Sequence, residues 1–162
     1  MNKQKVLGKL LLCVFCVSLI VWDIYVYLCI GVSHQYDIEY DGGIAQIELL
    51  NNLWLSLTCF LAINCSVLVL CTILFVTTKS FFKLRLALYS VGIICGFVML
   101  YHSNHLCNRL VDLSISNLYA VNDILKPQYN ICIIVNILTT VVLVICDCFY
   151  YKSHYTDYRH NT

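Results

Sequence analysis

The chain has 162 residues, of which 60% are hydrophobic and only 12% are charged. A soluble domain carries about twice that share of charged residues, and a soluble fold of this size could not bury so large an apolar excess. The formal net charge of +1 argues against a surface made for nucleic acid or for acidic substrates. The composition therefore predicts an integral membrane protein whose main surroundings are the lipid bilayer, with no nucleic-acid partner.

Four apolar segments are long enough to cross the hydrocarbon core, which takes about 20 residues of helix. They cover residues 10–32, 53–77, 84–101 and 131–150. We expect helices, because isolated strands would leave backbone groups without hydrogen bonds in lipid. The first segment exceeds the apolar region of a signal peptide and no A-x-A-like cleavage site follows it. We therefore expect it to remain as a span.

The basic residues indicate the orientation. Eight of the ten Lys and Arg residues lie before the first span, between the second and third, or after the fourth. The segments 33–52 and 102–130 contain only Arg109 and Lys126. Because Lys and Arg accumulate in cytoplasmic loops, we expect cytoplasmic N and C termini, with 33–52 and 102–130 as outer loops. The predicted fold is all-α: a single four-helix transmembrane bundle, residues 1–162, with up-down-up-down topology.

The second outer segment has its own apolar pattern. Leucines and a valine recur there at helical spacing, with polar residues on the other faces; they are Leu106, Leu110, Leu113, Val121 and Leu125. Pro127 is expected to break any helix before the fourth span. Two interpretations fit this pattern: an amphipathic helix on the outer membrane surface, or a continuation of the third helix packed against its neighbours.

Three polar residues lie inside the predicted spans: Asp23 in the first, Asn64 in the second and Asn136 in the fourth. Their positions place all three in the outer half of the bundle, where they can meet. A carboxylate at this depth costs about 3 kcal/mol unless it is neutral or partnered, and it suggests an ion or proton path. The other interpretation is polar contact between helices, worth about 0.6 kcal/mol per hydrogen bond. We favour the second, because no row of polar residues follows one helix face.

The third span contains a G-x-x-x-G motif, Gly92 and Gly96. Two glycines at this spacing let a neighbouring backbone approach closely. The motif is common, so it predicts only which face of the third helix packs, within the bundle or against a partner.

Most of the 11 cysteines lie in apolar segments, where a thiol behaves as a small hydrophobe. A disulfide framework is therefore not expected, although Cys29 and Cys107 lie near the outer ends and are compatible with one bridge. Cys13 and Cys16 form a C-x-x-C pair, but apolar surroundings make thiols inert, which argues against a thiol oxidoreductase.

The sequence shows no nucleophile elbow, phosphate loop or zinc-protease motif. His102 and His105 supply only part of a metal site, which needs three or four ligands. We therefore expect no catalytic residue, no cofactor and no metal, and we interpret the protein as a non-enzyme.

Two short stretches carry a resemblance to a known family. Residues 39–41 (EYD) form an acidic stretch before the second span, and residues 90–95 (SVGIIC) lie in the third. Both are similar to motifs of the transmembrane protein 107 family, small four-span proteins of the ciliary transition zone, over residues 36–107. The resemblance implies a part in cilium assembly and in gating the ciliary membrane. The claudin and tetraspanin motifs of the outer loops are missing.

These observations favour a non-enzymatic multi-pass scaffold or assembly subunit of a membrane complex, whose partners are other membrane proteins. Homo-oligomerisation is compatible with this function. The membrane is that of the cilium if the resemblance holds, and otherwise the plasma membrane or an endomembrane. The alternatives are a small transporter or channel that uses Asp23, and a junctional tetraspan protein.

Overall fold

The computed structural model describes the backbone of residues 3–36, 43–77, 81–113 and 120–159, and the side chains of residues 7–31, 43–76, 81–113 and 121–152. Helices account for nearly all of these ranges, and the described part of the chain contains no strand. The elements in chain order are α1 (Lys3–Tyr36), α2 (Gly43–Thr77), α3 (Phe82–Leu113), the π-helical turn η1 (Ala120–Leu125) and α4 (Lys126–Arg159).

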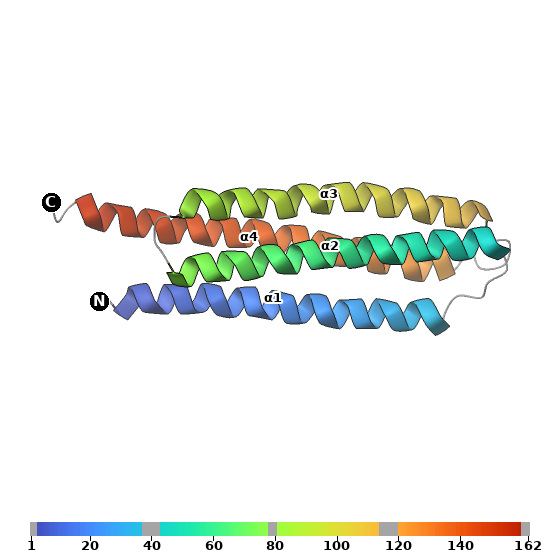
Figure 1. Cartoon of the computed structure of the whole chain (residues 1–162), viewed down its shortest axis with the longest axis horizontal. Helices are drawn as coiled ribbons and strands as arrows, with labels where there is room; N and C mark the ends of the chain where they lie inside the picture. The colour runs from blue at the N-terminus through green and yellow to red at the C-terminus, as the bar shows by residue number, and fades with distance from the viewer. Residues whose placement is uncertain (1–2, 37–42, 78–80, 114–119, 160–162) are drawn as a thin grey trace.

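The four long helices form one elongated bundle (Figure 1). Helices α1 and α3 each pack against both α2 and α4. Both chain termini lie at one end of the bundle, which we call the terminal end; α2 begins and α3 ends at the other, which we call the distal end. The fold is therefore the predicted all-α four-helix bundle.

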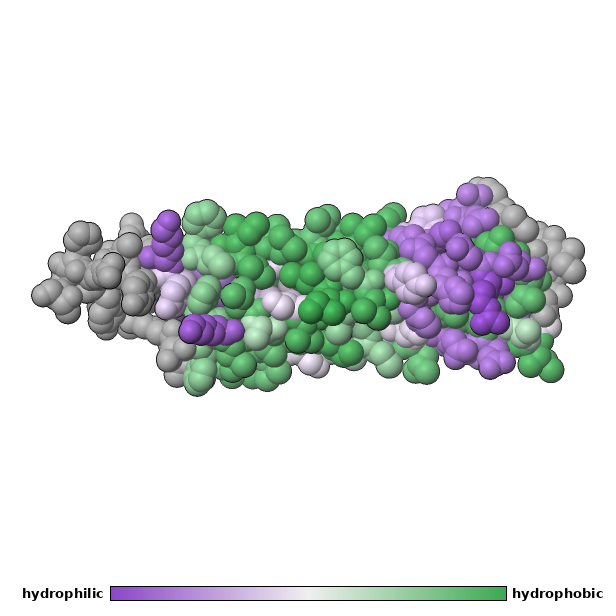
Figure 2. All heavy atoms as spheres, turned by 90° about the horizontal axis from the view of Figure 1, so that it is seen from above, coloured by the Kyte–Doolittle hydropathy of each residue, from purple (hydrophilic) through white to green (hydrophobic). Residues whose placement is uncertain are grey.

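All four helices are long and apolar enough to cross a bilayer. Figure 2 shows an apolar belt between hydrophilic ends, with the broader hydrophilic zone at the distal end. The chain is thus a multi-pass membrane protein with four spans. Yet α2 has 35 residues, which at 1.5 Å per residue makes about 52 Å, whereas the hydrocarbon core is only about 30 Å thick. The helices therefore continue well beyond the belt.

The continuation lies mainly at the distal end, where the helices extend past the predicted spans. Residues 43–52 are the first turns of α2, residues 102–113 are the last turns of α3, and residues 120–130 are η1 and the start of α4. Pro127 lies in the first turn of α4, where proline is tolerated. Of the two interpretations of the second outer segment, the structure supports the second: α3 continues through residues 102–113 and packs against its neighbours. We call residues 43–53, 102–113 and 121–130 the distal head.

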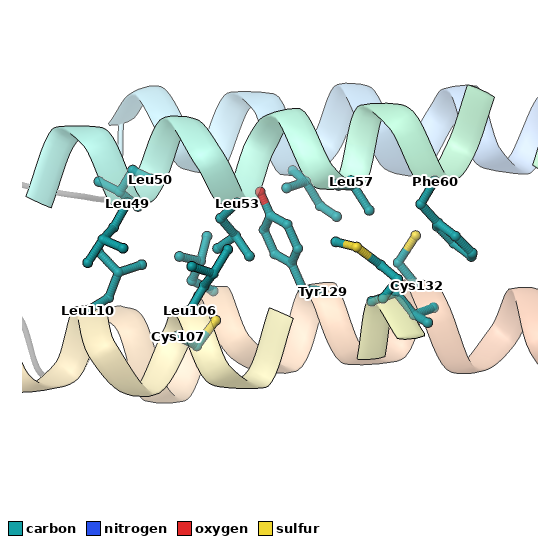
Figure 3. Close-up of a cluster of buried hydrophobic side chains, with 14 of the residues drawn as sticks. Leu49, Leu50, Leu53, Leu57, Phe60, Leu106, Cys107, Leu110, Tyr129 and Cys132 are labelled. Atoms are coloured by element: carbon teal, nitrogen blue, oxygen red, sulfur yellow. The ribbon is translucent and has the colours of Figure 1, made fainter. Parts of the chain in front are cut away.

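The distal head has an apolar interior of its own. In Figure 3, Leu110 and Leu106 of α3 point toward Leu49, Leu50 and Leu53 of α2. All five are buried members of one hydrophobic cluster that continues into the membrane. A second such cluster fills the terminal half of the bundle, around Cys16, Leu68, Phe75, Tyr89 and Leu143.

The two glycines of the third helix face the inside of the bundle, and both are buried. A Cβ atom added at Gly96 would lie 2.5 Å from Cγ1 of Ile137 on α4. One added at Gly92 would lie 3.5 Å from Oδ1 of Asn64 on α2 and 4.0 Å from Cγ2 of Thr140 on α4, which is ordinary contact. The motif therefore packs α3 within the bundle, and Gly96 is the tighter position.

We expect Gly96→Ala to destabilise the bundle by about 1–3 kcal/mol, the usual cost of overpacking, because Ile137 would have to move. Gly92→Ala is the matched control and should cost nothing measurable, since alanine also favours helix over glycine. Unfolding of both variants in mixed micelles would measure the two effects. Equal stability of the two variants would contradict the tight contact at Gly96.

Candidate functional site

A buried polar layer crosses the middle of the bundle. It contains Asp23 of α1, Asn64 of α2 and Asn136 of α4, which are 1%, 3% and 3% exposed. The amide nitrogen Nδ2 of Asn64 donates hydrogen bonds to Oδ2 of Asp23, at 3.3 Å, and to Oδ1 of Asn136. One amide group thus joins three helices, and the structure brings together the three polar residues that the sequence singled out.

Neighbouring groups complete this layer. Nδ2 of Asn136 donates to the carbonyl oxygen of Cys132 at 3.0 Å, and the hydroxyl of Thr140 donates to the carbonyl oxygen of Asn136 at 2.8 Å. The thiol of Cys65 lies 3.7 Å from Oδ2 of Asp23 and donates to it. These three residues were not singled out from the sequence, because hydroxyls and thiols are common in spans and only their neighbours reveal them.

One atom of the layer has no partner. Oδ1 of Asp23 makes no hydrogen bond within the part of the chain that the structure describes. An ionised carboxylate there would be costly, at about 3 kcal/mol for a charge at the centre of a span. The layer can therefore act in two ways: it can hold the helices together through neutral hydrogen-bonding groups, or it can take up a proton or a cation at Oδ1.

The layer is enclosed on both sides along the bundle axis. On its distal side lie Phe60 of α2 and Ile133 of α4, which belong to the distal apolar cluster. On its terminal side lie Leu19 of α1, Val67 of α2 and Leu143 of α4, from the other cluster. The described side chains therefore form no continuous polar path through the bundle.

The second polar site is a buried ion pair at the terminal end. Arg85 of α3 donates from Nε and Nη2 to the two carboxylate oxygens of Asp147 on α4, both at 2.9 Å. The two side chains are 3% and 2% exposed. Two parallel charge-assisted hydrogen bonds make this a strong and directional contact.

Aromatic rings surround this pair. The guanidinium carbon of Arg85 lies 4.0 Å from the ring centre of Phe75 on α2, a distance typical of a cation–π contact. Phe82 and Tyr151 stack with ring centres 4.2 Å apart, and Phe75 meets Tyr150 edge-on at 6.0 Å. The pair and its rings thus join α2, α3 and α4.

Sequence reasoning missed this ion pair. The sequence places Arg85 at the start of the third predicted span and Asp147 near the end of the fourth, and neither was singled out as a site residue. A usable signal was present, because an antiparallel arrangement of neighbouring spans puts the start of one beside the end of the next. Opposite charges at these two positions lie at similar depth.

The remaining candidates do not come together. Cys29 is exposed on α1, whereas Cys107 is 1% exposed in the core, and both are free thiols. The disulfide considered between them is therefore not formed, because one side chain faces outward and the other faces the bundle interior. His102 and His105 are both exposed in the distal head.

No known family, curated protein or solved structure matches this chain.

Proposed function

We propose that the protein is a non-enzymatic scaffold or assembly subunit of a membrane complex. The observation that carries this proposal is the closure of the interior. The polar groups of Asp23, Asn64 and Asn136 bind one another between two apolar clusters, and Arg85 binds Asp147. Such an interior stabilises a bundle and leaves its outer faces for contacts with lipid and partners.

The described charges support cytoplasmic termini. Outside the Arg85–Asp147 pair, the charged side chains described at the terminal end are all basic: Lys9, Lys83 and Lys152. The distal head carries both signs, on Glu48, Arg109, Asp112, Asp123 and Lys126. Because basic residues remain on the cytoplasmic side, we place the terminal end there and the distal head on the opposite side.

The family resemblance of residues 36–107 favours the ciliary transition zone as the site of this complex. The test is to express the chain with a C-terminal tag in ciliated cells and to label its neighbours by proximity. A focus at the ciliary base with transition-zone neighbours is the expected result. A diffuse plasma-membrane or endomembrane signal would contradict the ciliary part, and a junctional signal would favour the junctional alternative.

A second candidate function is proton- or cation-coupled transport through Asp23. It is favoured by a single observation, the partnerless Oδ1 atom of a carboxyl group that is 1% exposed. A proton or a monovalent cation bound at this atom would satisfy it. Transport would also require the apolar clusters on both sides to open.

The substitution Asp23→Asn separates the two functions. The asparagine keeps the shape and an oxygen that accepts from Nδ2 of Asn64, so a scaffold should assemble with its partners as before. Asp23→Leu, which removes the acceptor, should weaken the bundle by about 1 kcal/mol. Unfolding in mixed micelles would measure the stability of each variant, and proximity labelling would show whether each variant recovers the wild-type neighbours.

Uptake by proteoliposomes tests the competing function with the same variants. If the wild-type chain moves protons or cations and Asp23→Asn does not, the transporter is supported and the scaffold proposal is contradicted. If the wild type and both variants give only the flux measured with protein-free vesicles, the scaffold proposal is supported.

A further inference from the structure

Asp23 is the acidic group of the buried polar layer, and the helices that share the layer bring no basic side chain to its depth. On α1 the nearest Lys or Arg is Lys9, 14 positions away, which is about 21 Å along the helix axis. Helix α2 contains no Lys or Arg. On α4 the nearest is Lys126, 10 positions from Asn136, or about 15 Å. None of these cations can pair with Asp23.

The remaining helix, α3, passes the layer at Gly92, where an added Cβ atom would lie 3.5 Å from Oδ1 of Asn64. Its nearest basic side chain is Arg85, seven positions away, or about 10 Å along the axis. Arg85 already binds both carboxylate oxygens of Asp147, so this pair has no charge to spare for Asp23. A buried carboxylate without a cation is strongly disfavoured, and such a group becomes neutral instead.

The hydrogen bonds distinguish the two oxygens of Asp23. Oδ2 accepts from Nδ2 of Asn64 at 3.3 Å and from the thiol of Cys65 at 3.7 Å. Oδ1 makes no hydrogen bond within the described part of the chain. A protonated carboxyl group has one hydroxyl oxygen and one carbonyl oxygen that accepts. The two donors at Oδ2 therefore mark it as the carbonyl, which leaves Oδ1 for the proton.

A metal cation would need more oxygen atoms than the layer offers. Hard cations such as calcium take six or more oxygen ligands, whereas a proton needs only one. Oδ2 of Asp23 and Oδ1 of Asn136 both accept from the amide of Asn64, so each already faces a donor. Among the described residues, no three His, Cys, Asp or Glu side chains are grouped so that they could hold a metal ion.

We infer that Asp23 is a neutral carboxylic acid in the resting protein, with a proton bound at Oδ1 and the carbonyl at Oδ2. The polar layer is then uncharged, since its other members carry amide, hydroxyl and thiol groups. A resident proton is compatible with a scaffold and with a proton carrier alike. Its test therefore reads Asp23 directly and does not depend on partners or on flux.

Infrared spectroscopy of the full-length chain in lipid vesicles tests this state, because a neutral carboxylic acid has a carbonyl stretching band that a carboxylate lacks. The other described carboxyl groups are exposed in the distal head or paired with Arg85, and ordinary carboxyl groups are ionised at neutral pH. The wild type should show the band. Asp23→Asn should lose it, and Asp123→Asn, which changes an exposed group, should keep it. A wild type without the band, or a band that persists in Asp23→Asn, would overturn the inference.

A second variant tests the two oxygens while the acid stays in place. Cys65→Ala removes the thiol that donates to Oδ2, so the band should remain and move to higher frequency, because a carbonyl that accepts fewer hydrogen bonds has a stiffer bond. Cys59→Ala, which changes an exposed cysteine of the same helix, is the matched control and should leave the band in place. Equal band positions in the two variants would contradict a carbonyl at Oδ2.

Sodium ions separate a bound proton from a bound metal cation. Spectra of the wild type recorded with sodium or with choline as the added cation should be the same. A band that disappears in sodium would show that the ion displaces the proton, and would overturn the inference in favour of a cation site.

Discussion

Arg85→Met is expected to destabilise the bundle by about 3–5 kcal/mol, the cost of breaking a buried ion pair by removing one partner. Asp147, whose side chain is 2% exposed in the wild type, would be left with no cation beside it, and the cation–π contact of Arg85 with Phe75 would be lost. The free energy of unfolding can be measured by titration with a denaturing detergent, with circular dichroism as the readout of helix content.

The double variant Arg85→Met/Asp147→Leu tests whether the loss in Arg85→Met comes from leaving Asp147 buried without a cation. Apolar residues of similar volume remove both charges, and such replacements are often neutral or even stabilising. We therefore expect it to recover most of the stability lost in Arg85→Met. Lys83→Met, an exposed neighbour on the same helix, should stay within about 0.5 kcal/mol of wild type. A loss below about 1 kcal/mol in Arg85→Met would mean that water reaches the pair.

The ion pair is a feature that hydropathy and the distribution of Lys and Arg do not predict. Hydropathy and the distribution of Lys and Arg predicted the four helices, because the bilayer requires long apolar segments, and the structure confirms that fold. The same statistics treat each charge by its side of the membrane. They do not show which charges face one another across the bundle, so they could not predict the pairing of Arg85 with Asp147.

The polar layer was easier to predict from the sequence than the ion pair. Asp23, Asn64 and Asn136 are polar groups at similar depth, and polar groups in lipid seek one another because hydrocarbon offers no alternative partner. Their meeting followed from position alone. Which atom bridges the others, and that Oδ1 of Asp23 makes no hydrogen bond, depends on rotamers and helix rotation that the sequence does not specify.

The distal head was the least predictable part. Its apolar residues repeat with helical period, and this repeat is the same for a helix lying on a membrane and for one packed against other helices. The two arrangements differ in whether another helix covers the apolar face, and that depends on the surface opposite it. That surface lies in the first turns of α2, where Leu49 and Leu50 are buried in a segment expected as loop.

Leu110→Ala is expected to destabilise the distal head by about 2–5 kcal/mol, the range for truncating a fully buried leucine. Leu110 is 0% exposed and belongs to the same buried cluster as Leu49 and Leu50, so the variant leaves a cavity between α2 and α3. Hydrogen exchange of the backbone amides, measured in micelles, should rise in residues 102–113 and 43–53. Exchange in the membrane-embedded turns should change little.

Leu113→Ala is the matched control, because Leu113 ends the same helix and is 37% exposed. Its truncation removes the same atoms from a half-solvated position and should leave exchange nearly unchanged. If residues 102–113 instead lay on the membrane surface, the two leucines would serve equally as lipid contacts, and the two variants would weaken the segment alike. A large difference between them is therefore evidence for a packed core that continues out of the bilayer.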